Sequence, residues 1–113
     1  MRPLYHPPFE EITVQGIMYA LSDPVRARIF AELARAQHPQ NCSAFVFNGN
    51  LKLPKSTLSQ HFKILREAGL IRSERKGVEL KNLTRCPELN KKFGGMVPEI
   101  LRAYANESKQ SKR

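Results

Sequence analysis

Features that would place a protein in a membrane or outside the cell are missing from this sequence of 113 residues. A transmembrane helix needs about 18 or more consecutive apolar residues, and no such run occurs. The first eight residues carry one basic side chain and three prolines but no apolar segment, so we expect no secretory signal. These absences predict a soluble protein of the cytoplasm that does not act at a membrane.

Cysteine is scarce, which excludes a fold held together by disulfides. The two cysteines, Cys42 and Cys86, are too few for such a framework and are expected to be thiols in a reducing compartment. A transition-metal site needs three or four sulfur or nitrogen ligands, so His6 and His38 would have to converge with both cysteines across the fold or a dimer. We expect these side chains to be unconnected, and we predict no metal site and no cofactor.

The usual arrangements of catalytic residues are also missing. The sequence contains no Gly-rich phosphate loop, no recognisable pair of acid and base carboxylates, and no nucleophile accompanied by a base and an orienting group. We therefore predict that the protein is not an enzyme.

Positive charge, in contrast, is abundant and unevenly distributed. The formal net charge is +9, from 19 basic and 10 acidic residues. The two signs balance over residues 1–51, whereas residues 52–81 carry a net +5 and residues 82–113 a net +4. A concentrated positive field attracts polyanions and releases their counterions on contact. From charge alone, a basic surface that binds nothing and is simply solvated is as probable as a surface that binds a polyanion. The position of the charge within the fold has to decide between these two.

Periodic apolar residues and helix-end signals predict a mainly α fold. The helix over 54–68 has two possible starts. Pro54 could be its first residue, or Thr57 and Gln60 could form a capping box. The last helical region is expected in two pieces because Gly94, Gly95 and Pro98 interrupt it. The helices that we predict cover residues 9–20, a segment from Asp23-Pro24 to His38-Pro39, residues 54–68, and two pieces from Pro87 onward, the second starting near Pro98.

A small β-hairpin completes the predicted fold. Two runs of alternating residues flank Lys76-Gly77 within 70–84, which is typical of two antiparallel strands joined by a tight turn. For 41–52 we predict only one short helical turn, because the residues Asn48-Gly49-Asn50 favour a turn over a longer helix. The expected organisation is an extended N-terminal arm over 1–8, one domain over 9–107 and a basic disordered tail over 108–113.

The helix over 55–68 has one apolar side and one side suited to nucleic acid. Leu58, Phe62 and Leu65 recur at helical spacing and form a stripe for burial. Thr57, Ser59 and Gln60 suit the donors and acceptors of base edges, whereas Lys55, Ser56 and Lys63 suit phosphates. The residues that we predict to contact DNA, including the basic hairpin, are Lys55, Ser56, Thr57, Ser59, Gln60, His61, Lys63, Arg72, Arg75, Lys76 and Lys81.

Two segments of the sequence resemble one family of DNA-binding proteins. Residues 21–26 (LSDPVR) and 56–71 (STLSQHFKILREAGLI) are similar to the ArsR/SmtB family of bacterial winged-helix repressors, and the resemblance covers about Tyr19 to Thr84. It implies a winged helix-turn-helix with a recognition helix over 55–68 and a wing over 70–84. Gly94, Gly95 and Pro98 break the final helix of the family pattern, and Asn48-Gly49-Asn50 weakens an earlier one.

The resemblance also implies a homodimer that binds duplex DNA in the nucleoid at an inverted-repeat operator and releases it on binding an effector, which the sequence leaves unknown. Helices at both ends of the chain would form the dimer, through Ile12, Ile17, Ile100, Leu101 and Tyr104. The metal ligands of the metal-sensing members are missing. Cys42 and Cys86 are placed roughly as in members with a thiol switch, although two inert thiols are the favoured interpretation.

A second hypothesis uses the same fold differently. The basic face could meet an acidic protein or bind nucleic acid without sequence preference, so that the protein has no operator of its own. A sequence-specific regulator should prefer its own site over bulk duplex by about 10³-fold or more, whereas a general polyanion binder should not.

Overall fold

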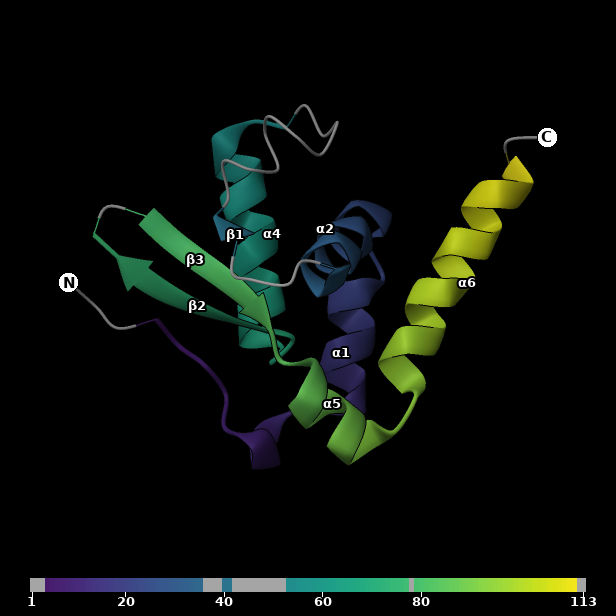
Figure 1. Cartoon of the computed structure of the whole chain (residues 1–113), viewed down its shortest axis with the longest axis horizontal. Coiled ribbons are helices and arrows are strands. Elements are labelled where there is room, and N and C mark those ends of the chain that lie inside the picture. Colours follow the sequence, from purple (N-terminus) through teal and green to yellow (C-terminus); the bar gives the residue numbers. More distant parts are fainter. Residues whose placement is uncertain (1–3, 36–39, 42–52, 78, 112–113) are drawn as a thin grey trace.

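Helices make up most of the chain and surround one small antiparallel sheet, as the sequence predicts (Figure 1). The computed structural model describes residues 4–35, 40–41, 53–77 and 79–111. Its elements are a 3-10 helix η1 (Phe9–Glu11), α1 (Val14–Leu21), α2 (Pro24–Arg35), β1 (Gln40–Asn41), α4 (Lys55–Glu67), β2 (Ile71–Lys76), β3 (Glu79–Thr84), α5 (Cys86–Phe93) and α6 (Met96–Ser111).

The first helix begins later than predicted. Instead of one helix over 9–20, the short η1 is followed by an extended residue, Ile12, and α1 starts only at Val14. The hydroxyl of Thr13 accepts a hydrogen bond from the backbone N–H of Gly16 at 3.0 Å, which makes Thr13 the N-cap of α1. The extended backbone at Ile12 lets its side chain enter the core, where it is 3% exposed.

The second helix confirms the predicted start signal. The carboxylate of Asp23 accepts hydrogen bonds from the backbone N–H groups of Val25 at 2.8 Å and Arg26 at 3.1 Å. Pro24 occupies the first helical position, where a missing N–H costs nothing. The helix is described as far as Arg35, so its predicted end at His38-Pro39 lies outside the described residues.

Helix α4 settles the alternative that the sequence left open at its start. Pro54 is the N-cap residue, and Thr57 lies inside the helix rather than before it, so the capping box was wrong. Leu58, Phe62 and Leu65 are buried, as their spacing predicts. The helix stops at Gly69, where φ is +88°, a conformation that glycine adopts without strain.

The hairpin is confirmed, but the sheet has a third strand that the sequence did not reveal. Strands β2 and β3 are antiparallel neighbours that pair Ile71 with Thr84 and Lys76 with Glu79, and Gly77 turns the chain with φ of +64°. The two-residue β1 pairs with the other edge of β3, which gives the order β1-β3-β2. Two residues are too few to show an alternating pattern. The rest of the helical turn predicted for 41–52 lies outside the described residues.

The C-terminal region forms two helices, as predicted, with different bounds. Gly94, at φ +63°, ends α5, and α6 starts at Met96 rather than near Pro98. Pro98 therefore falls in the first turn of α6, where a backbone N–H has no partner within the helix. The disordered tail predicted from Ser108 is instead helical as far as Ser111.

One apolar core joins α1, α2, α4 and α5, and it contains two residues that were predicted to form a dimer. Ile12 is 3% exposed and Ile17 is 0% exposed, so both pack inside their own chain and cannot be contact residues on its surface. The helical spacing identified the apolar side of α1 correctly, but that side faces the core. Ile100, Leu101 and Tyr104 of α6 are half-buried against the same core.

Replacing Gly69 with alanine should destabilise the fold. Its positive φ is strained for an L-residue, and an added Cβ would lie 2.6 Å from Cγ1 of Ile12. We expect Gly69→Ala to lower the free energy of unfolding by about 2–4 kcal/mol in urea titrations. Gly95→Ala is the matched control, because nothing lies within 4 Å of its added Cβ. Equal stability of the two variants would contradict this account of the turn.

Candidate nucleic-acid interface

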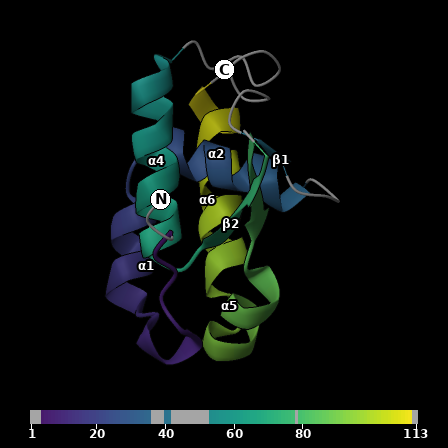
Figure 2. The same ribbon diagram turned by 90° about the vertical axis from the view of Figure 1, so that its left-hand side faces the viewer.

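Helix α4 presents a continuous polar side to solvent. Its apolar stripe faces the core, which forces the opposite side outward. Strand β2 lies beside α4 in Figure 2, and the two elements contact each other. The predicted contact residues of α4 that are exposed are Lys55, Ser56, Thr57, Ser59, Gln60 and Lys63.

His61 differs from the other predicted contact residues of α4, because it is half-buried and contacts a buried arginine. Nδ1 of His61 lies 3.3 Å from Nη1 of Arg26 in α2. Arg26 is 6% exposed, and its Nε donates to the carbonyl of Ala20 at 2.6 Å. Arg26 therefore joins the end of α1 to the middle of α4.

The hairpin places two basic residues at its tip and anchors a third at its base. Arg75 and Lys76 are exposed next to the turn at Gly77. Arg72 is exposed too, but its Nη2 lies 3.4 Å from a carboxylate oxygen of Glu88 in α5. Lys81 is half-buried in β3, opposite Glu74 in the strand register. The four hairpin residues predicted to meet DNA thus have different surroundings.

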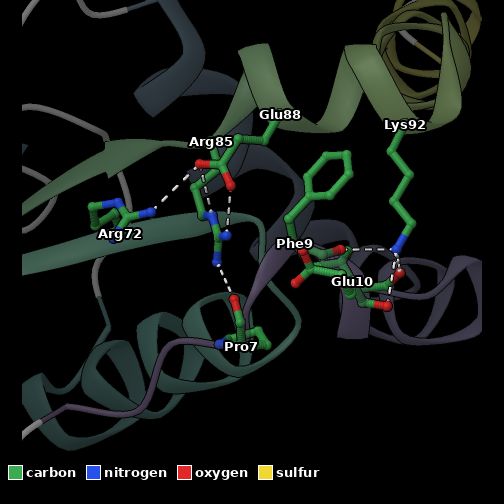
Figure 3. Close-up of polar contacts among 8 residues, drawn as sticks. Pro7, Phe9, Glu10, Arg72, Arg85, Glu88 and Lys92 are labelled. Carbon is green, nitrogen blue, oxygen red and sulfur yellow. Dashed lines mark hydrogen bonds and ion pairs between the residues drawn. The ribbon is translucent and has the colours of Figure 1, made fainter.

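A buried arginine ties the base of the hairpin to α5 and to the N-terminal segment (Figure 3). Arg85 is 4% exposed, and its Nη2 donates to Oε2 of Glu88 at 2.6 Å. Its Nη1 donates to the carbonyl of Pro7 at 2.8 Å. The hydrogen bond from Arg85 lowers the pKa of Glu88 more than burial raises it. Because Glu88 also pairs with Arg72, one carboxylate fixes the orientation of two cations.

The N-terminal segment packs along the hairpin and α5. Nε2 of His6 accepts a hydrogen bond from the backbone N–H of Ser73 in β2 at 3.0 Å. Further along, Nζ of Lys92 in α5 donates to the carbonyl of Ile12 at 2.7 Å. It also donates to the carbonyl of Phe9 at 2.8 Å, and Figure 3 shows these two residues. Residues 4–8 were predicted as an extended arm, and this backbone has no regular structure but is bound to the domain.

Comparisons with known proteins agree on what this arrangement is. A family model described as a helix-turn-helix domain matches residues 21–74. The solved structure of an ArsR-like transcriptional regulator from Rhodococcus sp. RHA1 matches with a TM-score of 0.58 and 27% sequence identity, over 86% of this chain and 83% of that one. The chain is therefore similar to ArsR-like regulators in sequence and in its winged helix-turn-helix fold. No curated protein matches its sequence at a significant level.

The matches to a helix-turn-helix domain and to an ArsR-like regulator confirm the predicted class of function. The chain is a DNA-binding transcriptional regulator and not an enzyme. The matched residues 21–74 include α4 and most of β2, which are the elements that carry the exposed polar and basic side chains. None of the helices in the described part of the chain is long and apolar enough to cross a membrane.

Of the two candidate sensor residues, only Cys86 lies among the described residues. The thiol of Cys86 is half-buried at the start of α5 and packs against the core. Cys42 lies outside the described residues, so the predicted thiol pair remains a hypothesis. Among the residues that the structure describes, no three His, Cys, Asp or Glu side chains gather closely enough to hold a metal ion.

Sequence reasoning missed the two buried arginines. Arg26 and Arg85 entered the sequence analysis only through the charge balance and the LSDPVR segment, yet both are almost fully buried. One signal was present for each: Arg26 follows the N-cap Asp23 by three residues, and Arg85 precedes Glu88 by three. Opposite charges at this spacing lie on neighbouring turns, but they also occur on solvated helix surfaces, as Arg35 with Glu32 and Arg102 with Glu99 do here. The signal therefore had little specificity.

The contact between His6 and Ser73 should make stability depend on pH. Burial, followed by the nearby charges of Arg72, Arg66 and Arg85, lowers the pKa of His6 from its ordinary 6.5. As the pH falls through 6.5, the unfolded chain takes up this proton first, so the free energy of unfolding should decrease. Asp23 and Glu88 have pKa values lowered from 3.8 and 4.5, so their contributions are lost only at lower pH.

Urea titrations above and below pH 6.5 would measure this loss in the wild type and in His6→Gln. Glutamine carries an amide oxygen that can accept from the N–H of Ser73 and does not titrate, so the variant should lose less stability on acidification. An identical loss in both proteins would show that another group is responsible.

Proposed function

We propose that the protein is a homodimeric repressor that binds an inverted-repeat operator in the nucleoid. The observation that carries this proposal is the exposed polar side of α4, together with a neighbouring hairpin whose tip is basic. A recognition helix needs short polar side chains for base edges and cations beside them for phosphates. In α4 both kinds occur on one side of one rigid helix, and the opposite side is locked in the core.

In this proposal the exposed residues of α4 divide their roles. Thr57, Ser59 and Gln60 contact base edges in the major groove, and Lys55 and Lys63 contact the phosphates that flank it. The N-cap of α4 is Pro54, whose side chain offers no hydrogen bond to the first N–H groups. These N–H groups, together with the hydroxyl of Ser56, are suited to a phosphate at the positive end of the helix dipole.

The hairpin adds contacts to the neighbouring backbone. Arg75 and Lys76 lie at its exposed tip, where their length suits a phosphate or the minor groove. Arg72 is held by Glu88, and Lys81 is half-buried, so we assign these two residues a smaller share of the binding than the tip. The base of the hairpin is fixed by Arg85, which favours a wing of defined orientation.

Exposed apolar residues of α1 favour a dimer. Val14 is 44% exposed, Met18 is 57% exposed and Tyr19 is 64% exposed, and all three lie on one helix. Such residues are uncommon in a cluster on a monomer surface and mark an interface. We infer that this side of α1 and the half-buried Ile100, Leu101 and Tyr104 of α6 meet a second copy. A two-fold dimer would read half-sites about 34–36 Å apart.

A selection of bound fragments from random duplex DNA tests the proposal. Recovery of one inverted-repeat motif is the expected result, with a preference of about 10³-fold or more over bulk duplex. Recovery of no motif, together with binding that disappears as salt increases, would instead indicate a general polyanion binder.

Repeating the selection after mild oxidation tests whether Cys42 and Cys86 act as a thiol switch. If they do, the motif should no longer be recovered.

Two substitutions should separate reading of bases from binding of phosphates. Gln60→Ala should relax the preference at one base pair of each half-site, because glutamine can pair with an adenine edge. The expected loss of discrimination against the wrong base is about 1–3 kcal/mol. Lys76→Ala should weaken all sequences alike and lower the slope of log affinity against log salt by about one. Quantitative binding to the operator and to point variants of it distinguishes the two. Equal losses on every sequence for both variants would mean that the reading side of α4 is misplaced.

A charge on the exposed side of α1 should break the dimer. Met18→Asp would place a carboxylate in the proposed apolar interface, where burial without a partner costs several kcal/mol. We expect a monomer at micromolar concentration in sedimentation equilibrium and much weaker binding to the inverted repeat. Leu83→Asp is the control, since Leu83 is a similarly exposed apolar residue, 43% exposed, on the sheet. A dimeric Met18→Asp protein would rule out this side of α1.

A further inference from the structure

The contact between Arg26 and His61 has a chemical consequence for α4. Arg26 is held in place by three groups outside α4: Nε donates to the carbonyl of Ala20 at 2.6 Å, Nη2 donates to the carbonyl of Tyr19 at 3.4 Å, and the carboxylate of Asp23 lies 3.9 Å from Nη1. The ring of Tyr19 also lies 5.7 Å from the guanidinium carbon. These contacts fix the position of the guanidinium independently of α4.

The direction of the hydrogen bond to His61 fixes the position of the imidazole proton. A guanidinium carries only donors, so Nη1 of Arg26 must donate and Nδ1 of His61 must accept, at 3.3 Å. A neutral imidazole carries its one proton on the other nitrogen when Nδ1 accepts. In this arrangement Nε2 of His61 carries the N–H.

The surroundings of His61 leave that N–H without a partner in the described part of the protein. The hydrogen bonds found for His61 there involve Nδ1 alone. The side chain is half-buried on the flank of α4, next in sequence to the exposed Gln60. Residues on the flank of a recognition helix face the sugar–phosphate backbone when the central residues face the bases.

We propose that Arg26 is a positioning residue that holds His61 as its Nε2–H tautomer, so that α4 offers a neutral N–H donor to a DNA phosphate. The phosphate contact rests on the function proposed above, whereas the tautomer does not. The donor adds no net charge, unlike Lys63 on the same helix. Its contribution should therefore be independent of DNA sequence and should leave the salt dependence of binding unchanged.

Nuclear magnetic resonance tests the tautomer without DNA. Two-bond proton–nitrogen correlations of the imidazole, recorded above the usual histidine pKa of about 6.5, distinguish the two neutral tautomers. We expect His61 to be the Nε2–H form in the wild type and a mixture of forms in Arg26→Met. Arg35→Met is the matched control on α2, because the Arg35 guanidinium is exposed and pairs with Glu32. An Nδ1–H form in the wild type would overturn the proposal even if Arg26→Met fails to fold.

Two substitutions of His61 test the phosphate contact. Asparagine can place its oxygen near the position of Nδ1 and so keep the contact with Arg26, but it has no donor at the position of Nε2. Glutamine reaches further and can offer a donor there. We expect His61→Asn to weaken binding to every duplex by about tenfold, with an unchanged salt slope, and His61→Gln to recover most of that loss.

The outcomes separate the two proposals. Lys63→Ala, measured in parallel, should reduce the salt slope by about one, as a charged phosphate contact does. Wild-type affinity in His61→Asn, or a loss confined to one base pair, would overturn the phosphate contact while the regulator proposal stands. If the wild type binds no duplex DNA, the regulator proposal and the contact both fail, and the tautomer is still decided by its own spectrum.

Discussion

Burial of Leu58, Phe62 and Leu65 is the constraint on which the rest of the interface depends. Full burial of a large apolar side chain contributes about 1.5–3 kcal/mol, whereas a typical internal hydrogen bond contributes about 1 kcal/mol. Rotating α4 by one residue would expose this stripe, so no single polar contact could compensate for the loss. The core therefore decides which side of α4 faces solvent, and the polar residues could vary without changing that orientation.

Two buried arginines then connect the DNA-facing elements to the rest of the fold. Arg26 joins α1, α2 and α4, and Arg85 joins the base of the hairpin, α5 and the N-terminal segment. The Arg26 guanidinium donates to two backbone carbonyls and to a side chain, and that of Arg85 donates to one backbone carbonyl and to a side chain. Each can do so while buried because its donors have partners, and no buried side-chain nitrogen or oxygen in the described residues lacks a hydrogen bond. Helix α4 and the hairpin are thus anchored separately.

Local patterns predicted the elements better than they predicted the surroundings of single residues. The stripe of α4, the cap at Asp23 and the turns at Gly69 and Gly77 are determined by neighbours in sequence, so the sequence reveals them. The burial of Ile17 and Arg26 depends on which distant segments pack against them. Ile17 was predicted at an interface and lies in the core, while Arg26 is buried although it does not belong to the apolar stripe of its helix. Helical spacing identifies a side of a helix but not what that side meets.

The same distinction applies to the basic residues, whose number alone overstates the charge available to DNA. Arg26, Arg72 and Arg85 are committed to carboxylates, carbonyls or a histidine inside the fold. Lys55, Lys63, Arg75 and Lys76 are exposed on α4 and the hairpin tip, with no ion pair among the described residues. Cations of the first kind hold the interface in shape, and those of the second kind generate the field that a polyanion meets. Only the exposed cations of the second kind would release counterions from DNA.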